Sequence, residues 1–308
     1  MRGFDTPDRG TGRRLVLAGL AAPVLQGCVS PLPLSTAPVT TAEAKTLLDA
    51  SAAAHGLAAF MTIRDISISY AGVWRPVIGT LQPALVDRAF RGQSQERLIL
   101  AEGLTGQAHA GPDGRKQVTR RTAVGGQGAV NVWYNGGAAA EAERIAAAAL
   151  VSDGYALFLF GPLLAATSWM AGKSMVLDVM GTERLIRDGR EYTCDLLRAR
   201  ITPGIGLSDS DQVVLYIDRD ERLMRRARFT LNGLKSTRGA IAEVDTSAHV
   251  IRSGVRWPTR FHEHLLRPLS LPVHDWSLTG LDVDRGLVET EVTGPVFTGK
   301  ALPPAASV

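Results

Sequence analysis

The alternation of apolar and polar residues along most of the chain predicts a protein built mainly from β-strands. In the segment TIRDISISY, Ile66, Ile68 and Tyr70 would share one face and the polar residues between them the other, which is the pattern of a half-buried strand. The predicted turns between such runs are Pro112-Asp113-Gly114, Asn135-Gly136-Gly137, Asp188-Gly189, Asp218 to Glu221 and Ser253-Gly254. At least eight strands joined mostly by hairpins indicate a large antiparallel sheet, and a sheet of that width must curl or close.

Two segments interrupt the strand pattern with a helical one. The first, TAEAKTLLDASAAAHGLAAF, has Thr41 in a capping position and predicts a helix that ends near Gly56. The second extends from residue 138 to residue 170, and we expect Ser152-Asp153-Gly154 and Gly161-Pro162 to break it. Its apolar part is either a core helix or a lid across the mouth of an apolar cavity, or it touches a membrane. In the lid reading the key residues are Phe158 and Phe160.

The segment from Val255 to His264 predicts one strand with an apolar face and a basic face. Trp257 and Phe261 belong to the apolar face, whereas arginines and histidines alternate with them. His262 and His264 would point to the same side and could share a metal ion, but the neighbouring arginines would repel a cation. We therefore expect two solvated histidines and no metal site.

The N-terminal region has the layout of a secretory signal. Arg13 and Arg14 precede an apolar run, Leu15 to Leu25, of eleven residues, whereas a membrane-spanning helix needs roughly 20. A buried first helix is the alternative, but Pro23 would break it. The arginine pair also resembles a twin-arginine export signal, which leaves the export route open.

The run ends in LQGC, which resembles the lipobox of bacterial lipoproteins. That resemblance implies that Cys28 becomes the lipidated first residue of the mature chain. We therefore expect a signal peptide over residues 1–27 and a lipidated N-terminus with an extended tether over residues 28–41, since this stretch is rich in proline, serine and threonine and uncharged.

Composition narrows the classes of protein further. The formal net charge is +4, and it falls to +2 when the four arginines and two aspartates of residues 1–27 are removed, which argues against a nucleic-acid binder. The cysteines are Cys28 and Cys194; if Cys28 is acylated, Cys194 has no disulfide partner and is expected to pack inside a strand.

The chain lacks a G-x-S-x-G elbow and an S-x-x-K motif, and AGKS at residues 171–174 lacks the glycine of a phosphate-binding loop, so neither an enzyme nor a cofactor is expected.

Two further segments carry a family resemblance. DQVVLYIDRDERLMRRARF and GVRWPTRFHEHL resemble strand motifs of the LolA/LolB-like family of bacterial lipoprotein carriers, and weaker similarity extends to WSLTGLDVDRGL and MTIRDISISYAGVWRP. The resemblance implies a mainly β, α+β fold: a half-open antiparallel barrel whose concave apolar face is covered by a few helices and holds acyl chains or another apolar ligand. It would form a single domain over residues 42–300, followed by a flexible tail over residues 301–308.

The resemblance and the strand pattern together predict a ligand cleft and a cellular role. The expected cleft residues are Ile66, Ile68, Phe158, Phe160, Leu215, Phe229, Trp257 and Phe261. The alternative is that these side chains simply fill a dry core. We expect a protein anchored by its lipid to a membrane of the bacterial envelope, the outer membrane facing the periplasm, that carries a lipid, an acyl chain or a lipidated protein. A non-catalytic scaffold that binds an envelope protein through its basic sheet face is the alternative function.

Overall fold

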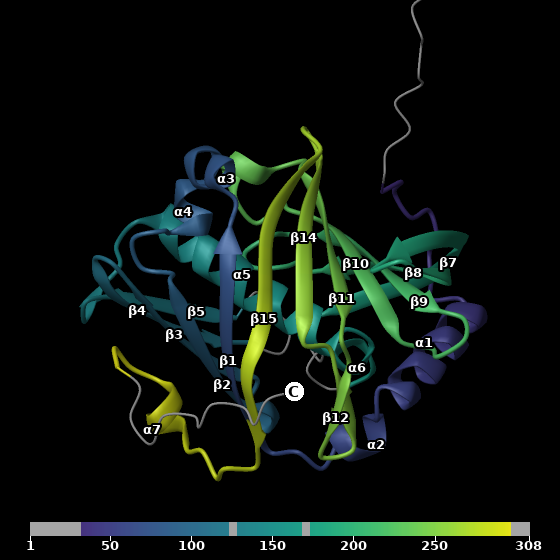
Figure 1. Cartoon of the computed structure of the whole chain (residues 1–308), viewed down its shortest axis with the longest axis horizontal. Helices are drawn as coiled ribbons and strands as arrows, with labels where there is room; N and C mark the ends of the chain where they lie inside the picture. The colour runs from purple at the N-terminus through teal and green to yellow at the C-terminus, as the bar shows by residue number, and fades with distance from the viewer. Residues whose placement is uncertain (1–31, 123–127, 168–172, 297–308) are drawn as a thin grey trace, which may run out of the picture. The chain divides into compact units, whose positions relative to one another are not determined.

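A single antiparallel sheet of thirteen strands dominates the part of the chain that the computed structural model describes, residues 32–122, 128–167 and 173–296 (Figure 1). Its strands follow the order β6-β5-β4-β3-β2-β1-β15-β14-β11-β10-β9-β8-β7. The bounds are β1 (Asp65–Trp74), β2 (Gln93–Ile99), β3 (Leu104–Gly111), β4 (Gly114–Arg121), β5 (Ala129–Tyr134), β6 (Gly137–Ala138), β7 (Ser174–Arg187), β8 (Arg190–Thr202), β9 (Asp211–Asp218), β10 (Met224–Thr230), β11 (Ile241–Ser247), β14 (Arg260–Arg267) and β15 (Leu271–Val283). The last long strand, β15, returns to pair with β1 and so joins the two halves of the sheet.

The helices are α1 (Ala42–Ala54), α2 (Leu57–Phe60), α3 (Pro76–Leu81), α4 (Pro83–Val86), α5 (Ala142–Phe160), α6 (Pro162–Ala166) and α7 (Glu289–Val292). Helices α1, α2, α5 and α6 supply buried residues to the main core on the inner face of the sheet. Helix α7 packs on the opposite face, where Val292 lies against Ile99 and Leu104. The central helix α5 contacts both halves: Ala148 packs with Val118 and Val132 of β4 and β5, and the Phe158 ring lies 5.2 Å from the Phe229 ring of β10. Because both halves of the sheet reach one helix, the sheet curves around it. The predicted fold class, mainly β with a large curled antiparallel sheet and a few helices, is confirmed.

The predicted hairpin turns lie where the strands end. Asp188 and Gly189 connect β7 to β8 with φ values of 51° and 75°. These positive φ values are what a two-residue hairpin of the right twist requires, and Asp-Gly adopts them readily. Asn135 and Ser253 also have positive φ at the predicted turns.

The second helical segment differs from its prediction. Ser152-Asp153-Gly154 lies inside α5, which continues without a break to Phe160. The helix is buried on most sides, and tertiary packing outweighs the weak helix propensity of these three residues. Gly161-Pro162 does separate α5 from α6: Gly161 has φ 43°, and a Cβ at this position would lie 2.6 Å from the Met224 sulfur.

The predicted strand from Val255 to His264 is also corrected. It is split at Pro258 and Thr259 into β13 (Val255–Trp257), which pairs with β12 (Val250–Arg252) in a separate two-stranded sheet, and β14 of the main sheet. A proline within the run has no N–H for a strand ladder. The two histidines are half-buried rather than solvated: His262 contacts Asp275, and His264 Nε2 lies 3.0 Å from Ser270 Oγ. Within the described ranges no group of three or more His, Cys, Asp or Glu side chains is placed to hold a metal ion.

The described part of the predicted tether lies against the sheet. Leu32 is buried, Arg198 donates to the Pro33 carbonyl at 2.9 Å, and the Ser35 amide donates to Gln212 Oε1 at 2.7 Å. The Thr41 amide donates to the Leu177 carbonyl of edge strand β7 at 3.0 Å. Residues 32–41 therefore cover part of an edge that would otherwise expose unpaired backbone groups. The predicted signal peptide (1–27), Cys28 and the predicted tail (301–308) lie outside the described residues.

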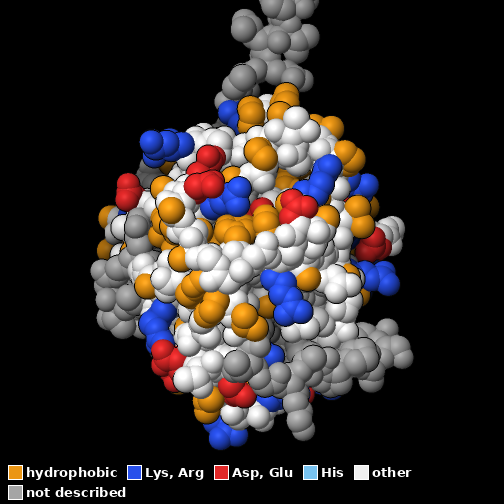
Figure 2. All heavy atoms as spheres, turned by 90° about the vertical axis from the view of Figure 1, so that its left-hand side faces the viewer, with side chains coloured by type: hydrophobic (Ala, Val, Ile, Leu, Met, Phe, Trp, Pro, Cys, Tyr) orange, Lys and Arg blue, Asp and Glu red, His pale blue; other side chains and the backbone are white. Residues whose placement is uncertain are grey.

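The predicted basic face of the segment from Val255 to His264 is divided between two sheets. Arg256 belongs to β13, whereas Arg260, His262 and His264 belong to β14, where His262 contacts Asp275. Elsewhere on the outer face of the main sheet, Arg198 pairs with Asp178, Arg226 with Asp245, and Arg228 with Glu243 at 3.0 Å. On the face that carries β3, β4 and β5, basic and acidic side chains are interspersed (Figure 2).

Candidate functional site

An apolar cavity of about 60 Å³ lies between helices α5 and α6 and strands β7, β8 and β9. Its walls are formed mainly by Leu157 and Leu164 from the helices and by Leu177, Leu197, Ala199 and Leu215 from the strands. Alternate residues of each strand face it, such as Leu197, Ala199 and Ile201 of β8, because side chains alternate across a sheet. The cavity is therefore a gap in the core that the side chains of the described residues leave unfilled.

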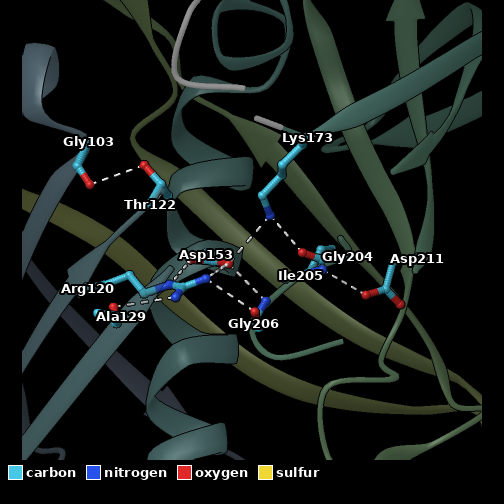
Figure 3. Close-up of polar contacts among 10 residues, drawn as sticks. All are labelled: Gly103, Arg120, Thr122, Ala129, Asp153, Lys173, Gly204, Ile205, Gly206 and Asp211. Carbon is cyan, nitrogen blue, oxygen red and sulfur yellow. Dashed lines mark hydrogen bonds and ion pairs between the residues drawn. The ribbon is translucent and has the colours of Figure 1, made fainter. Parts of the chain in front are cut away.

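One corner of the cavity is polar and rigid (Figure 3). Arg120 of β4 forms two hydrogen bonds with Asp153 of α5, Nε to Oδ1 at 2.9 Å and Nη2 to Oδ2 at 3.0 Å. The Gly206 amide donates to the same Oδ2 at 2.9 Å, and Arg120 also donates to the Gly206 carbonyl at 3.2 Å. Both side chains are largely buried, so this pair needs its full set of partners, and it holds α5 to β4 and to the loop before β9.

Lys173 lies at the same corner. Its Nζ donates to the Gly204 carbonyl at 2.7 Å and lies 3.9 Å from Asp153 Oδ2 (Figure 3). Burial lowers the pKa of the Lys173 ammonium. On the far side of the loop, Asp211 accepts from the Ile205 amide at 2.8 Å and from Thr230 Oγ1 at 2.5 Å, and burial raises the pKa of this carboxyl.

Only one of the eight predicted cleft residues, Leu215, lines this cavity. The other seven are buried in the same hydrophobic core but do not line it: Ile66, Ile68, Phe158, Phe160, Phe229, Trp257 and Phe261.

The two expected lid residues point into this core. Phe158 contacts Phe229, and the Phe160 ring lies 6.0 Å from the ring of Trp257. Trp257 is fully buried, and its indole N–H donates to the Arg252 carbonyl at 3.0 Å. These aromatic side chains therefore fill space between α5 and the sheet.

The polar corner was missed at the sequence level. Asp153 is an isolated charge within an otherwise apolar helical run, and such a charge needs a buried partner. Its position alone signals a polar site inside the core. Nothing in the sequence marks Arg120 as that partner, because it alternates with other polar residues along β4.

Cys194 is fully buried, and burial raises the pKa of its thiol to about 12. A thiol with so high a pKa is almost wholly protonated at neutral pH and is a poor nucleophile. No helix among residues 32–122, 128–167 and 173–296 combines the length and the hydropathy needed to cross a bilayer.

Comparison with known proteins identifies structural likeness only. No family model matches the chain, and no curated protein matches its sequence. A DUF1329 family protein from Desulfovibrio piger is similar in structure with a TM-score of 0.46, 15% identity, and coverage of 82% of this chain and 98% of its own. A LolA superfamily protein from Nitrosomonas europaea has a TM-score of 0.43, 10% identity, and coverage of 81% and 97%.

A putative outer membrane lipoprotein-sorting protein domain from Vibrio parahaemolyticus has a TM-score of 0.39, 10% identity, and coverage of 81% and 97%. Structural similarity to LolA superfamily proteins, expected from the strand motifs, is thus present. At these identities the likeness concerns the fold and carries no information about a ligand.

Proposed function

We propose that this chain is a lipid-anchored protein of the bacterial cell envelope that binds an acyl chain, from a lipid or a lipidated protein, in the cavity between α5, α6 and β7 to β9. The observation that carries the proposal is the apolar cavity that the described side chains leave between these elements. Anchoring through Cys28, and a place on the outer membrane facing the periplasm, are parts of the same proposal.

The size of the cavity sets how much of a chain it accepts. A volume of about 60 Å³ has room for roughly two methylene groups, since a cavity of about 150 Å³ holds one benzene molecule. Two buried methylenes contribute roughly 1.6 kcal/mol, which is less than the roughly 4 kcal/mol of a millimolar complex. A tighter complex requires a larger cavity.

Helix α6 is the wall that can yield to a longer chain. It has only five residues and is therefore too short to be stable by itself, and it follows the glycine at position 161. Its residues Leu164 and Ala165 line the cavity. An outward shift of α6 would extend the cavity without disturbing the strand ladder.

The scaffold alternative depends on a continuous basic face along the segment from Val255 to His264. That segment is divided between β13 and β14 of two different sheets, and His262 of the face contacts Asp275. The cavity corner likewise offers no pairing of a nucleophile with a base, so we propose no catalytic role.

The proposal is tested by filling the cavity. In Ala199→Leu the added methyl groups would occupy the empty volume, so binding of a fluorescent fatty acid should weaken at least tenfold while thermal stability stays equal or rises. Ala242→Leu is the matched control, because Ala242 is a buried alanine of the same sheet that does not line the cavity. Overpacking there should cost about 1–3 kcal/mol of stability and leave binding intact.

Native mass spectrometry of the mature chain, purified without delipidation, should also detect an apolar ligand. The proposal fails if the unmodified protein shows no saturable binding, or if Ala199→Leu binds the fatty acid as tightly as the unmodified protein does.

A further inference from the structure

Lys173 lies at one end of the cavity wall, and the side chains that follow it along this wall are apolar. Lys173, Met175 and Leu177 all line the cavity and are two residues apart along the entry to β7 and the strand itself. Side chains with this spacing share one face of an extended chain, and each step of two residues covers about 6.6 Å. One face of one segment thus presents an ammonium group followed by apolar side chains.

We propose that Lys173 binds the anionic head group of the ligand, so that the cavity takes a single-chain amphiphile with a carboxylate or phosphate head rather than a neutral lipid. This inference rests on the proposed function and names its ligand class. The acyl chain would extend from Lys173 past Met175 and Leu177 toward the leucines of β8 and β9.

The ammonium has hydrogen-bonding capacity to spare. It carries three N–H donors, and among the residues that the structure describes it uses one of them on the Gly204 carbonyl at 2.7 Å. The nearest carboxylate, Asp153, is 3.9 Å away and already accepts two hydrogen bonds from Arg120 and one from the Gly206 amide. Asp153 therefore does not depend on Lys173, and an incoming anion can take the remaining donors (Figure 3).

The charges around Lys173 determine how strongly an anionic head group is preferred over a neutral one. Arg120 and Asp153 form a closed pair, and Asp211 lies beyond the loop with its oxygens occupied by Ile205, Thr230 and Asn232. With Lys173 included, the corner holds two positive and two negative groups. Selectivity must then come from short-range hydrogen bonds to Lys173, and a charge-assisted bond of this kind gives about a tenfold preference.

The test compares ligands that differ only in the head group. Palmitic acid, lysophosphatidate and hexadecanol are each used to displace a neutral fluorescent probe from the mature chain, from Lys173→Met and from Lys173→Arg. We expect the unmodified protein to prefer either anion over the alcohol by about tenfold. Lys173→Met should lose that preference while its affinity for the alcohol stays the same, and Lys173→Arg should keep the preference.

The outcomes separate this inference from the function on which it rests. Equal binding of acid and alcohol by the unmodified protein overturns the role of Lys173 and leaves acyl-chain binding in place. An equal loss of both ligands in Lys173→Met, with Lys173→Arg unchanged, also overturns it, because the lysine would then support the cavity rather than the head group. Binding of neither ligand by the unmodified protein refutes the proposed function itself.

Discussion

Glu96 of β2 is a carboxylic acid placed where water cannot reach it. Its residue is 2% exposed, and it accepts a hydrogen bond from the Gln107 amide. Burial raises the pKa of the Glu96 carboxyl to about 7, against the weaker opposing effects of Gln107 and of the Arg91 charge. The folded protein therefore holds a proton on this residue at pH values where the unfolded chain has released it.

The sign of the resulting pH dependence follows from linkage. The ordinary pKa of a glutamate is 4.5, so the folded state binds the Glu96 proton more tightly than the unfolded chain does. The contribution of Glu96 to stability is therefore greatest below about pH 4.5 and declines as the pH rises to about 7. Glu96→Gln removes this decline. We expect the variant to gain roughly 3 kcal/mol relative to the parent between pH 4.5 and pH 8, as measured by urea denaturation across that range.

Glu143→Gln, at an exposed position of α5, is the matched control for the same chemical change outside the core. Other groups, such as His55 with its pKa lowered to about 4 by burial, are present in both proteins and cancel in the difference. A stability difference between Glu96→Gln and the parent that does not vary with pH would contradict the prediction.

At the scale of elements, the start of α1 connects the N-terminal segment to the cavity wall. The Thr41 hydroxyl caps the helix by accepting from the Ala44 amide at 3.2 Å, and the Thr41 backbone amide bonds to Leu177 of β7. Thr40 Oγ1 accepts from the Leu177 amide at 3.1 Å. The same strand supplies Met175 and Leu177 to the cavity, so the cap position also fixes one of its walls.

We expect Thr41→Val to destabilise the protein by about 1 kcal/mol, because it removes the capping oxygen and keeps the shape and the backbone bond. Thr46→Val is the control: Thr46 is an exposed residue of the same helix, and its hydroxyl bonds only to the Ala42 carbonyl. Its effect should stay within about 0.5 kcal/mol. Chemical denaturation of both variants decides the point, and equal effects would show that the cap contributes nothing.

The elements also show where sequence reasoning reaches its limit. The cap at Thr41 and the turn at Asp188-Gly189 depend on local chemistry, and both were predicted correctly. The continuity of α5 through Asp153 depends on Arg120, which is 33 residues away in the chain, and no local pattern encodes that contact. The alternation of apolar and polar residues in β8 and β9 predicts which side chains face the core. Which of those side chains line the cavity, and which are covered by other side chains, depends on how α5 and α6 pack against the strands.

At the scale of the whole molecule, the pairing of β15 with β1 gathers the core around α5. A curled sheet was predicted, but this particular pairing was not, since the hairpin signals specify neighbours along the chain and say nothing of a strand that returns from residue 283 to residue 66. It explains why Phe158 and Phe160, expected over a cleft mouth, lie inside. With both halves of the sheet packed on α5, the apolar cavity lies to the side of this aromatic cluster, against α6.

The last prediction concerns the anchor. If Cys28 is acylated, Cys28→Ala should release the mature protein from membranes, because each buried methylene of the lost chains contributes about 0.8 kcal/mol to membrane binding. Labelled fatty acid should enter the unmodified protein and not the variant, and fractionation after a salt wash should find the variant in the soluble fraction. Cys194→Ala serves as the control, since its buried thiol is inaccessible to acylation, and this variant should stay with the membrane. Membrane retention of Cys28→Ala, together with no labelling of the unmodified protein, would refute the anchor and leave acyl-chain binding in the cavity to be judged by its own titrations.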